Sequence, residues 1–207
     1  MAAPSRGVRR AVALAAAPVA VLAAGALVWQ SSTAAFTATT RNAGNAWSTG
    51  QVTLTDDDQG RAGFTVTNVV PGQSGERCIV VTSGATVPGE VRAYVQNLSA
   101  SGAGLQDRIF LQVERGTGGS FESCAGFTPQ VSTPTHPLSV LGTQWNSYAT
   151  GGASWTTQGT PGESTTYRGT WRFDTTGMTQ QQVDSLQGSQ VSVDLVWELQ
   201  SNDPATP

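Results

Sequence analysis

Two cysteines carry the most definite chemistry in this sequence. Cys78 and Cys124 are the only cysteines among 207 residues. An even cysteine count in an exported chain is typical of a disulfide, whereas two unrelated thiols are the alternative. Because the N-terminal region predicts export, we expect one bond between Cys78 and Cys124.

Catalytic side chains are scarce. His136 is the single histidine and lies in a turn-like stretch between two prolines, without a G-x-S-x-G or H-E-x-x-H motif. Asp56-Asp57-Asp58 offers oxygens that Ca²⁺ can use, but the spacing is not that of an EF-hand, and a solvated acidic turn is favoured. Glu163 and Glu198 are two of 14 acidic residues, and the sequence does not bring them together as a glycosidase pair. We predict a protein that is not an enzyme, with no cofactor and no metal site.

Tryptophans offer a second kind of chemistry, the stacking of sugars on exposed rings. Trp171 and Trp197 lie on the apolar faces of strongly alternating segments, which indicates packing in the core. A carbohydrate-binding hypothesis therefore depends on Trp47, Trp145 and Trp155 alone.

The N-terminal region has the composition of an export signal. Residues 1–10 contain three arginines, residues 11–29 form an apolar run without charge, and Ser32 and Ala34 are small. A signal peptidase reads small residues at these two positions, so we predict a helical signal peptide over residues 1–34, cleaved between Ala34 and Ala35. A retained membrane anchor is the alternative, since the apolar run nearly reaches the length that spans a bilayer.

The charge balance excludes some partners. Without the leader, 8 arginines stand against 14 acidic residues, and the chain contains no lysine. Nucleic acids require basic patches, so we predict no nucleic-acid binding. Contact with a membrane is expected only through an uncleaved leader.

The rest of the chain alternates like half-buried β-strands separated by Gly, Pro, Ser and Thr. Strands that each have one apolar face must bury it, which predicts a single all-β domain, an antiparallel sandwich over residues 47–200 with a polar tail at 201–207. The predicted strands are Gln51–Thr55, Ala62–Val70, Arg77–Thr82, Glu90–Leu98, Arg108–Arg115, Glu163–Asp174 and Gln190–Gln200.

Between the strands, one short helix is expected. Thr179-Gln180-Gln181-Gln182 fits a capping box, and Gly188 is placed to end the helix. Gly116–Pro137 is predicted as a long connection. Leu138–Leu141 and Trp145–Trp155 are ambiguous and could form short edge strands.

Residues 35–46 form an extended N-terminal segment ahead of the domain. Its first part, AFTATTRNAGN, contains an apolar anchor, Phe36, and no proline that would prevent strand pairing. Such a strand can add to an exposed sheet edge on another chain. We predict an assembly strand made of Phe36, Thr37, Ala38, Thr39 and Thr40, with an unstructured terminus as the alternative.

Several motifs resemble those of TasA/camelysin-type secreted proteins. The resemblance is carried by Ala34-Ala35-Phe36, by NAWSTGQVTL at 45–54, by VPGQS at 70–74 and by VDLVWELQ at 193–200. It implies cleavage before the Ala-Phe pair, a jelly-roll β-sandwich, and a role as a fibre subunit of a biofilm matrix in which an N-terminal segment completes the sheet of a neighbour. The camelysin branch is described as a metalloprotease, but this chain has no zinc motif onto which that role can be carried.

Three functional hypotheses follow. The leading one is a secreted or cell-surface structural protein that self-associates in an extracellular matrix, with a signal peptidase as its partner during export. The alternative is a monomeric surface module that binds a glycan or a protein through loops around Trp145 and Trp155. A camelysin-like secreted protease is the third.

Overall fold

The computed structural model describes residues 37–40, 52–64 and 68–202. All of them belong to one compact unit, Phe36–Pro207. The predicted signal peptide, the cleavage site at Ala34 and Ala35, and Phe36 lie outside the described residues.

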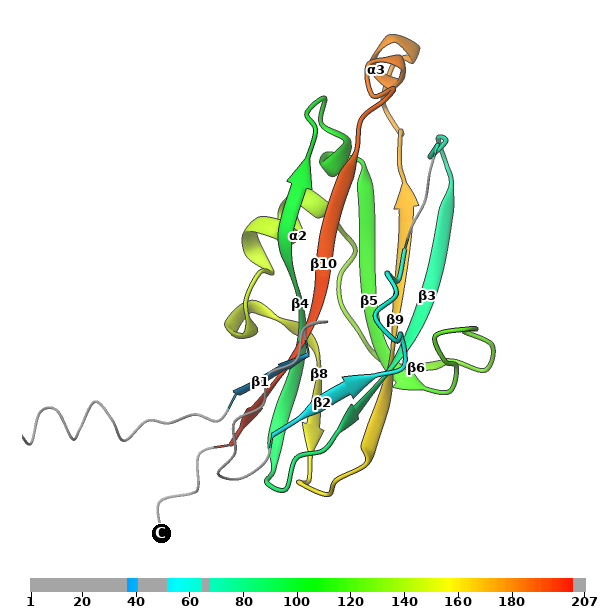
Figure 1. The fold of residues 1–207 in the computed structure, drawn as a ribbon. Coiled ribbons are helices and arrows are strands. Elements are labelled where there is room, and N and C mark those ends of the chain that lie inside the picture. Colours follow the sequence, from blue (N-terminus) through cyan, green and yellow to red (C-terminus); the bar gives the residue numbers. More distant parts are fainter. Residues whose placement is uncertain (1–36, 41–51, 65–67, 203–207) are drawn as a thin grey trace, which may run out of the picture. The chain divides into compact units, whose positions relative to one another are not determined.

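Two antiparallel sheets make up the domain (Figure 1), which confirms the predicted all-β sandwich. The four-stranded sheet, sheet A, has the order β1 (Thr37–Thr40), β10 (Val191–Ser201), β4 (Gly89–Ala100) and β8 (Gly152–Thr157). The six-stranded sheet, sheet B, has the order β2 (Leu54–Asp56), β3 (Ser74–Ser83), β9 (Glu163–Phe173), β5 (Ile109–Thr117) and β6 (Thr128–Ser132), and the short β7 (His136–Pro137) also pairs with β5.

The core lies between the sheets and follows from the period of two in the longest strands. On β9, Tyr167, Trp171 and Phe173 are 1%, 7% and 4% exposed, and they alternate with side chains on the outer face. On β10, Trp197 and Leu199 are also buried. The prediction that Trp171 and Trp197 are core residues is therefore confirmed.

Two of the predicted strands differ from the structure. The first begins later than expected, since β2 covers Leu54–Asp56. No strand forms in the described part of Ala62–Val70, so that prediction is wrong. Asn68 has a φ of 55°, a left-handed conformation that an extended strand does not accommodate.

Helical structure is more extensive than the single helix expected. The predicted helix is present as α3 (Gln180–Asp184), with the capping box of Thr179 and Gln182 formed. Residues 138–144 form a second helix, α2 (Leu138–Gln144), in place of a short edge strand. Leu138 and Leu141 are three positions apart and both buried, so a helical turn puts both into the core. Two single-turn 3₁₀ helices, η1 (Leu105–Asp107) and η2 (Tyr148–Thr150), complete the described helical segments.

One side of β10 is less exposed than its sequence suggests. The alternation of the strand places Glu198 on the side away from the core, yet its side chain belongs to a residue only 9% exposed. The hydroxyl of Tyr94 on the neighbouring strand donates a hydrogen bond to Glu198 Oε2 over 2.6 Å, which satisfies the buried carboxylate.

Candidate functional site

Among the described residues, only part of the outer edge of sheet A is covered by a strand. β1 pairs with β10 in a register that sets Thr37 opposite Gln200 and Thr40 opposite Trp197. Along the remaining part of β10, Val191–Val196, the structure describes no strand on the side away from β4. A sheet edge of this kind has backbone N–H and C=O groups available for another strand. Figure 1 shows β1 crossing only one end of β10.

A groove lies between this part of β10 and sheet B. Its volume is about 880 Å³. β10 contributes Val191, Val193 and Leu195 to its wall, and sheet B contributes Ile79, Ile109 and Trp171. The groove is thus an apolar space beside an available sheet edge, which are the two features that a strand-binding site combines.

Among the described residues, two buried hydrogen-bonding groups beside the groove have no hydrogen-bond partner. The indole Nε1 of Trp197 and the hydroxyl of Tyr167 make no hydrogen bond in the structure, although the residues are 5% and 1% exposed. Trp197 itself lines the groove. Leaving such a donor buried and unsatisfied costs about 1–3 kcal/mol.

The rim of the groove is acidic. Asp56, Asp58 and Asp194 line it, together with the single guanidinium of Arg61. Partial burial raises the pKa of Asp56 to about 6, and the neighbouring carboxyl of Asp58 adds to the shift through a hydrogen bond and its charge. No group of three or more His, Cys, Asp or Glu side chains in the described part of the chain could hold a metal ion.

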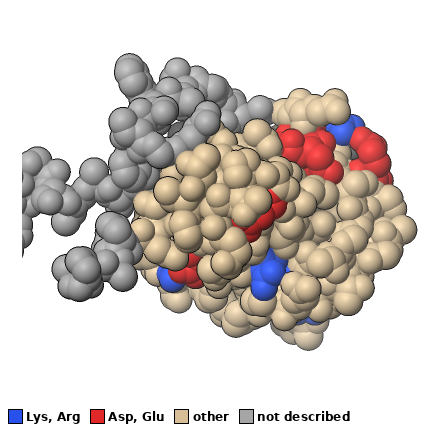
Figure 2. Space-filling view, turned by 90° about the horizontal axis from the view of Figure 1, so that it is seen from below, with Lys and Arg blue, Asp and Glu red and all other residues tan. Residues whose placement is uncertain are grey.

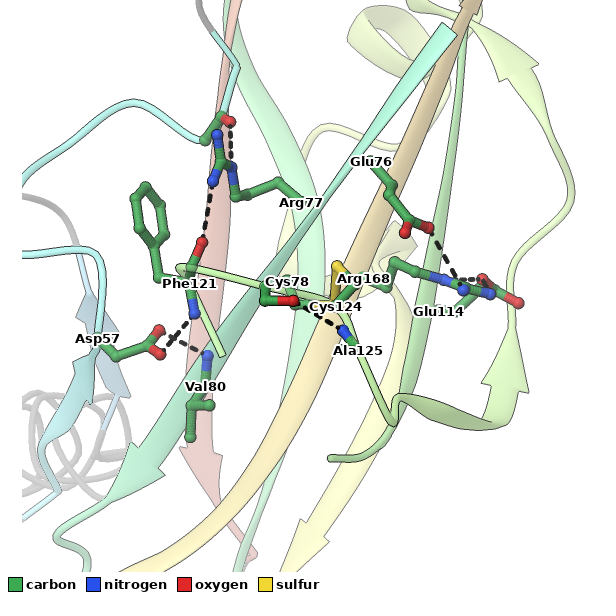
Figure 3. The surroundings of a disulfide bond; sticks show 12 residues. Asp57, Glu76, Arg77, Cys78, Val80, Glu114, Phe121, Cys124, Ala125 and Arg168 are labelled. Carbon is green, nitrogen blue, oxygen red and sulfur yellow. Dashed lines mark hydrogen bonds and ion pairs between the residues drawn. A yellow bond between two sulfur atoms is a disulfide. The ribbon is translucent and has the colours of Figure 1, made fainter. Parts of the chain in front are cut away.

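The edge of sheet B is closed by side chains. Asp57 accepts hydrogen bonds from the backbone N–H of Val80 on β3 and from that of Phe121, both over 2.8 Å (Figure 3). Arg77, also on β3, donates to the carbonyl oxygens of Gly63 and Phe121. Of these contacts, the one from Val80 N–H occupies a backbone donor of β3, and the others hold Gly63 and Phe121 beside this edge.

Phe121 belongs to the loop between β5 and β6, residues 118–127, which we call the strap. Cys124 of the strap is bonded to Cys78 of β3 with a Cα–Cα distance of 5.3 Å, so the predicted disulfide is confirmed. Cys78, Arg168 and Glu114 are cross-strand neighbours on β3, β9 and β5. The strap thus reaches from β5 across β9 to β3. Figure 3 shows Phe121 with Asp57 and Arg77 on one side of the disulfide and Arg168 with Glu76 and Glu114 on the other.

The remaining chemically interesting residues do not form a site. His136 lies on β7 with its ring 5.7 Å from that of Trp145. Glu163 accepts hydrogen bonds from the backbone N–H groups of Gln158 and Thr160 in the turn before β9. Glu198 is on the other sheet and is held by Tyr94. Each carboxylate has a local structural role, and the structure does not join Glu163 and Glu198 in a pair.

Neither of the two described tryptophans in the carbohydrate-binding alternative, Trp145 and Trp155, is fully exposed. Trp155 is 9% exposed and belongs to the core, and Trp145 is partly buried against the second part of the core. Trp47 lies outside the described residues. Among the described tryptophans, Trp145 is the one that is not buried, and part of it packs against the core.

Charged groups are sparse on the face seen in Figure 2, where acidic and basic side chains occur close together and no basic patch is visible. In the described part of the chain, no helix combines the length and the apolar character needed to cross a membrane. Neither a protein-family model nor a curated protein matches the sequence. The antiparallel β-sandwich and its partly open edge are therefore the basis for a functional proposal.

Sequence reasoning located the disulfide and the N-terminal strand but missed two features. Asp57 is the middle one of three consecutive aspartates. Nothing in the sequence shows that Asp57, and not Asp56 or Asp58, accepts the two backbone hydrogen bonds. The groove depends on how far the sheets separate beside β10, for which the sequence contains no signal. For the strap, the sequence contains one indication, which is a cysteine within a Gly-rich connection.

Proposed function

We propose that this chain is an exported structural protein that self-associates by exchanging its N-terminal strand between copies. The observation that supports the proposal is the pairing of Thr37–Thr40 with Trp197–Gln200 at the edge of sheet A. The same four backbone pairs can form when the strand comes from a neighbouring copy. Exchange of an identical element replaces contacts with equal ones, so it costs little.

Two properties of the edge favour this role. β1 is only four residues long, so detaching it breaks few contacts and leaves the core in place. Beyond it, β10 continues past Val196 to Val191 beside an apolar groove. A strand from another copy can thus be longer than β1.

We further propose that the fold is a jelly roll. The order β1-β10-β4-β8 facing β3-β9-β5-β6 supports this, because these strands alternate between the sheets along the chain except at β5 and β6, which pair with each other, as in two Greek keys. β2 is then an additional strand at the edge of β3. In this arrangement β1 is the first strand of the jelly roll, and exchanging it leaves every other strand in its own copy.

Export, and membership of the TasA/camelysin-type group, belong to the same proposal. The disulfide supports export, since such bonds persist in oxidising compartments. N-terminal sequencing of secreted protein should find Ala35 as the first residue. A chain that retains Met1 would instead support an anchored protein.

The decisive experiment compares a chain starting at Ala35 with one starting at Trp47, by sedimentation and electron microscopy at equal concentrations. We expect assemblies only from the longer chain. If both chains stay monomeric, or both assemble equally, strand exchange is wrong. A monomeric result for both would favour the surface-binding module.

A cross-link distinguishes pairing within one copy from pairing between copies. In a Thr37→Cys/Gln200→Cys variant, the two substituted positions are directly opposite each other in the observed register. Oxidation within one copy gives a monomer on a non-reducing gel, whereas exchange gives a ladder of covalent oligomers. The Thr37→Cys and Gln200→Cys single variants are matched controls, because neither can form a ladder. If the protein assembles but the double variant forms no ladder of covalent oligomers, strand exchange is contradicted.

A further inference from the structure

The disulfide joins two cysteines in unequal surroundings. Cys78 has no exposed surface, since it lies on β3 with Arg168 of β9 beside it in the register. Cys124 is partly exposed, because it belongs to the strap. Thiol–disulfide exchange requires the attacking thiolate to reach a sulfur atom. An external thiolate can therefore reach the sulfur of Cys124 more easily than that of Cys78.

The disulfide is also the only covalent attachment of the strap to β3. Around it, the strap has little regular structure of its own. Gly118, Gly119 and Gly126 have φ values of 79°, 74° and 77°, which are left-handed conformations favoured by glycine. Two hydrogen bonds between Ser120 and Ser123 close a small turn. A glycine-rich segment has many unfolded conformations, so a cross-link contributes much to holding it in one.

The end of the strap closes the edge of β3. Phe121 is 4% exposed, and the guanidinium carbons of Arg61 and Arg77 are 4.3 and 4.9 Å from the centre of its ring. Its N–H donates to Asp57 and its carbonyl accepts from Arg77. Phe121 is three residues from Cys124, so the disulfide anchors the strap close to the residue that makes these contacts.

We propose that Cys124 is a thiol–disulfide exchange site through which an external thiol opens the strap and uncovers the edge of β3. Of the two edges compared here, at β10 and at β3, the oxidised chain has the β10 edge available, and reduction adds the β3 edge. This inference does not depend on strand exchange through β1, because it concerns the opposite sheet.

The exchange is balanced with an external thiol as the only co-reactant. Its thiolate attacks Cys124 Sγ, the bond between the two cysteine sulfurs breaks, and Cys78 leaves as a thiolate that takes a proton from water. The product is a mixed disulfide on Cys124. A second external thiolate attacks the external sulfur of that mixed disulfide, which yields an oxidised external disulfide and a free Cys124 thiol. Two electrons pass from the external thiols to the protein.

The site of attack can be read by mass spectrometry. The oxidised full-length mature chain is treated briefly with glutathione, and the freed thiol is trapped at once with iodoacetamide. We expect glutathione on Cys124 and the alkyl group on Cys78. Glutathione on Cys78, or equal amounts on both cysteines, would overturn the assignment.

Opening of the strap can be read by hydrogen exchange after complete reduction. We expect the amides of Val80 and Phe121 to exchange faster, on the order of tenfold. The reason is that opening the strap breaks or weakens the hydrogen bond that each amide donates to Asp57. Amides in the centres of β9 and β10 should keep their protection, and reoxidation should restore the original rates. A Cys78→Ala/Cys124→Ala variant should match the reduced chain. Unchanged exchange at both amides, or loss of protection throughout the domain, would overturn the proposal.

Discussion

The edges of the two sheets at β3 and β10 are protected from strand pairing in different ways. At β3 in sheet B, the backbone N–H of Val80, just beyond β2, donates to Asp57, and Asp57 and Arg77 hold the strap beside this edge through Phe121. At β10 in sheet A, the four residues of β1 cover one end, and the structure describes no strand along Val191–Val196. Charged side chains and a cross-linked loop protect the β3 edge, whereas the only described cover of the β10 edge is the short strand β1.

This difference shows how a sandwich can restrict where other chains pair with it. Charged side chains that point along an edge, and segments that fold over it, are common protections against unwanted strand pairing. β3 has both. Of these two edges, the one at β10 is then where a strand of matching length can add. The following predictions change one edge at a time.

The largest effect is expected from removing the disulfide. A Cys78→Ala/Cys124→Ala variant should lower the free energy of unfolding by about 4 kcal/mol, the chain-entropy value for a loop closed by residues 46 positions apart. Urea denaturation measures this loss. Pairing at the β10 edge should persist, so an equal loss of hydrogen-exchange protection along β10 would contradict the separation of the two edges.

Removing Asp57 should have the next largest effect. Asp57→Ala leaves the N–H groups of Val80 and Phe121 without an acceptor, and we expect a loss of about 2–4 kcal/mol in urea denaturation. Asp58→Ala is the matched control, because the hydrogen bond that Asp58 accepts from Gly60 lies in an exposed turn. The control should lose less than about 1 kcal/mol. Equal losses in the two variants would mean that the closure of β3 does not depend on Asp57.

Removing β1 should destabilise the monomer much less. Four cross-strand pairs contribute about 0.2–1 kcal/mol each, and the backbone entropy of ordering four residues offsets most of that gain. A chain starting at Trp47 should therefore unfold within about 1 kcal/mol of one starting at Ala35, measured at concentrations at which both are monomeric. A loss as large as that of Asp57→Ala would show that β1 is an integral part of the core and unsuited to exchange.

The smallest effect concerns pH at the rim of the groove. The folded chain holds the proton of Asp56 up to a pKa of about 6, whereas the unfolded chain releases it near 3.8. The free energy of unfolding should therefore fall as pH rises from about 4 to 6. Asp56→Asn should remove this slope and stabilise the domain above pH 6 by less than about 1 kcal/mol, because solvent screens a partly exposed group.

Urea denaturation at a series of pH values measures this effect, and the two proteins should be equally stable below about pH 4. A wild-type chain that is more stable than Asp56→Asn above about pH 6 would contradict a raised pKa for Asp56 in the folded state.

The parts of the fold that the sequence predicted well are those with a strong local pattern. The alternation of Tyr167, Trp171 and Phe173 defines β9 nearly to the residue. Thr179 and Gln182 identify the start of α3 through side chains that bond to nearby backbone. Such signals lie within a few residues of the element they define, and no distant partner is needed to read them.

The parts that were missed depend on contacts between distant residues. β6 pairs with β5 along an exposed sheet edge, so its side chains need no apolar alternation, and it was hidden in a Gly- and Pro-rich connection. α2 is too short for a helical period to stand out. The partner of β1 and the role of Asp57 follow from the tertiary arrangement alone.

The order of the strands has a consequence for how fast the domain folds. From β3 onward, the long strands alternate between the two sheets, and β1 at the start of the sandwich pairs with β10 at its end. Folding rates fall as contacts join residues farther apart in sequence, and sandwiches dominated by such contacts fold in milliseconds to seconds. Sheet A, in which β10 joins β1 to β4, cannot be completed before the last strand has been synthesised. If the chain is exported as proposed, it can therefore pass through a translocation channel before it folds. β1 can pair with β10 only after β10 has emerged from the channel.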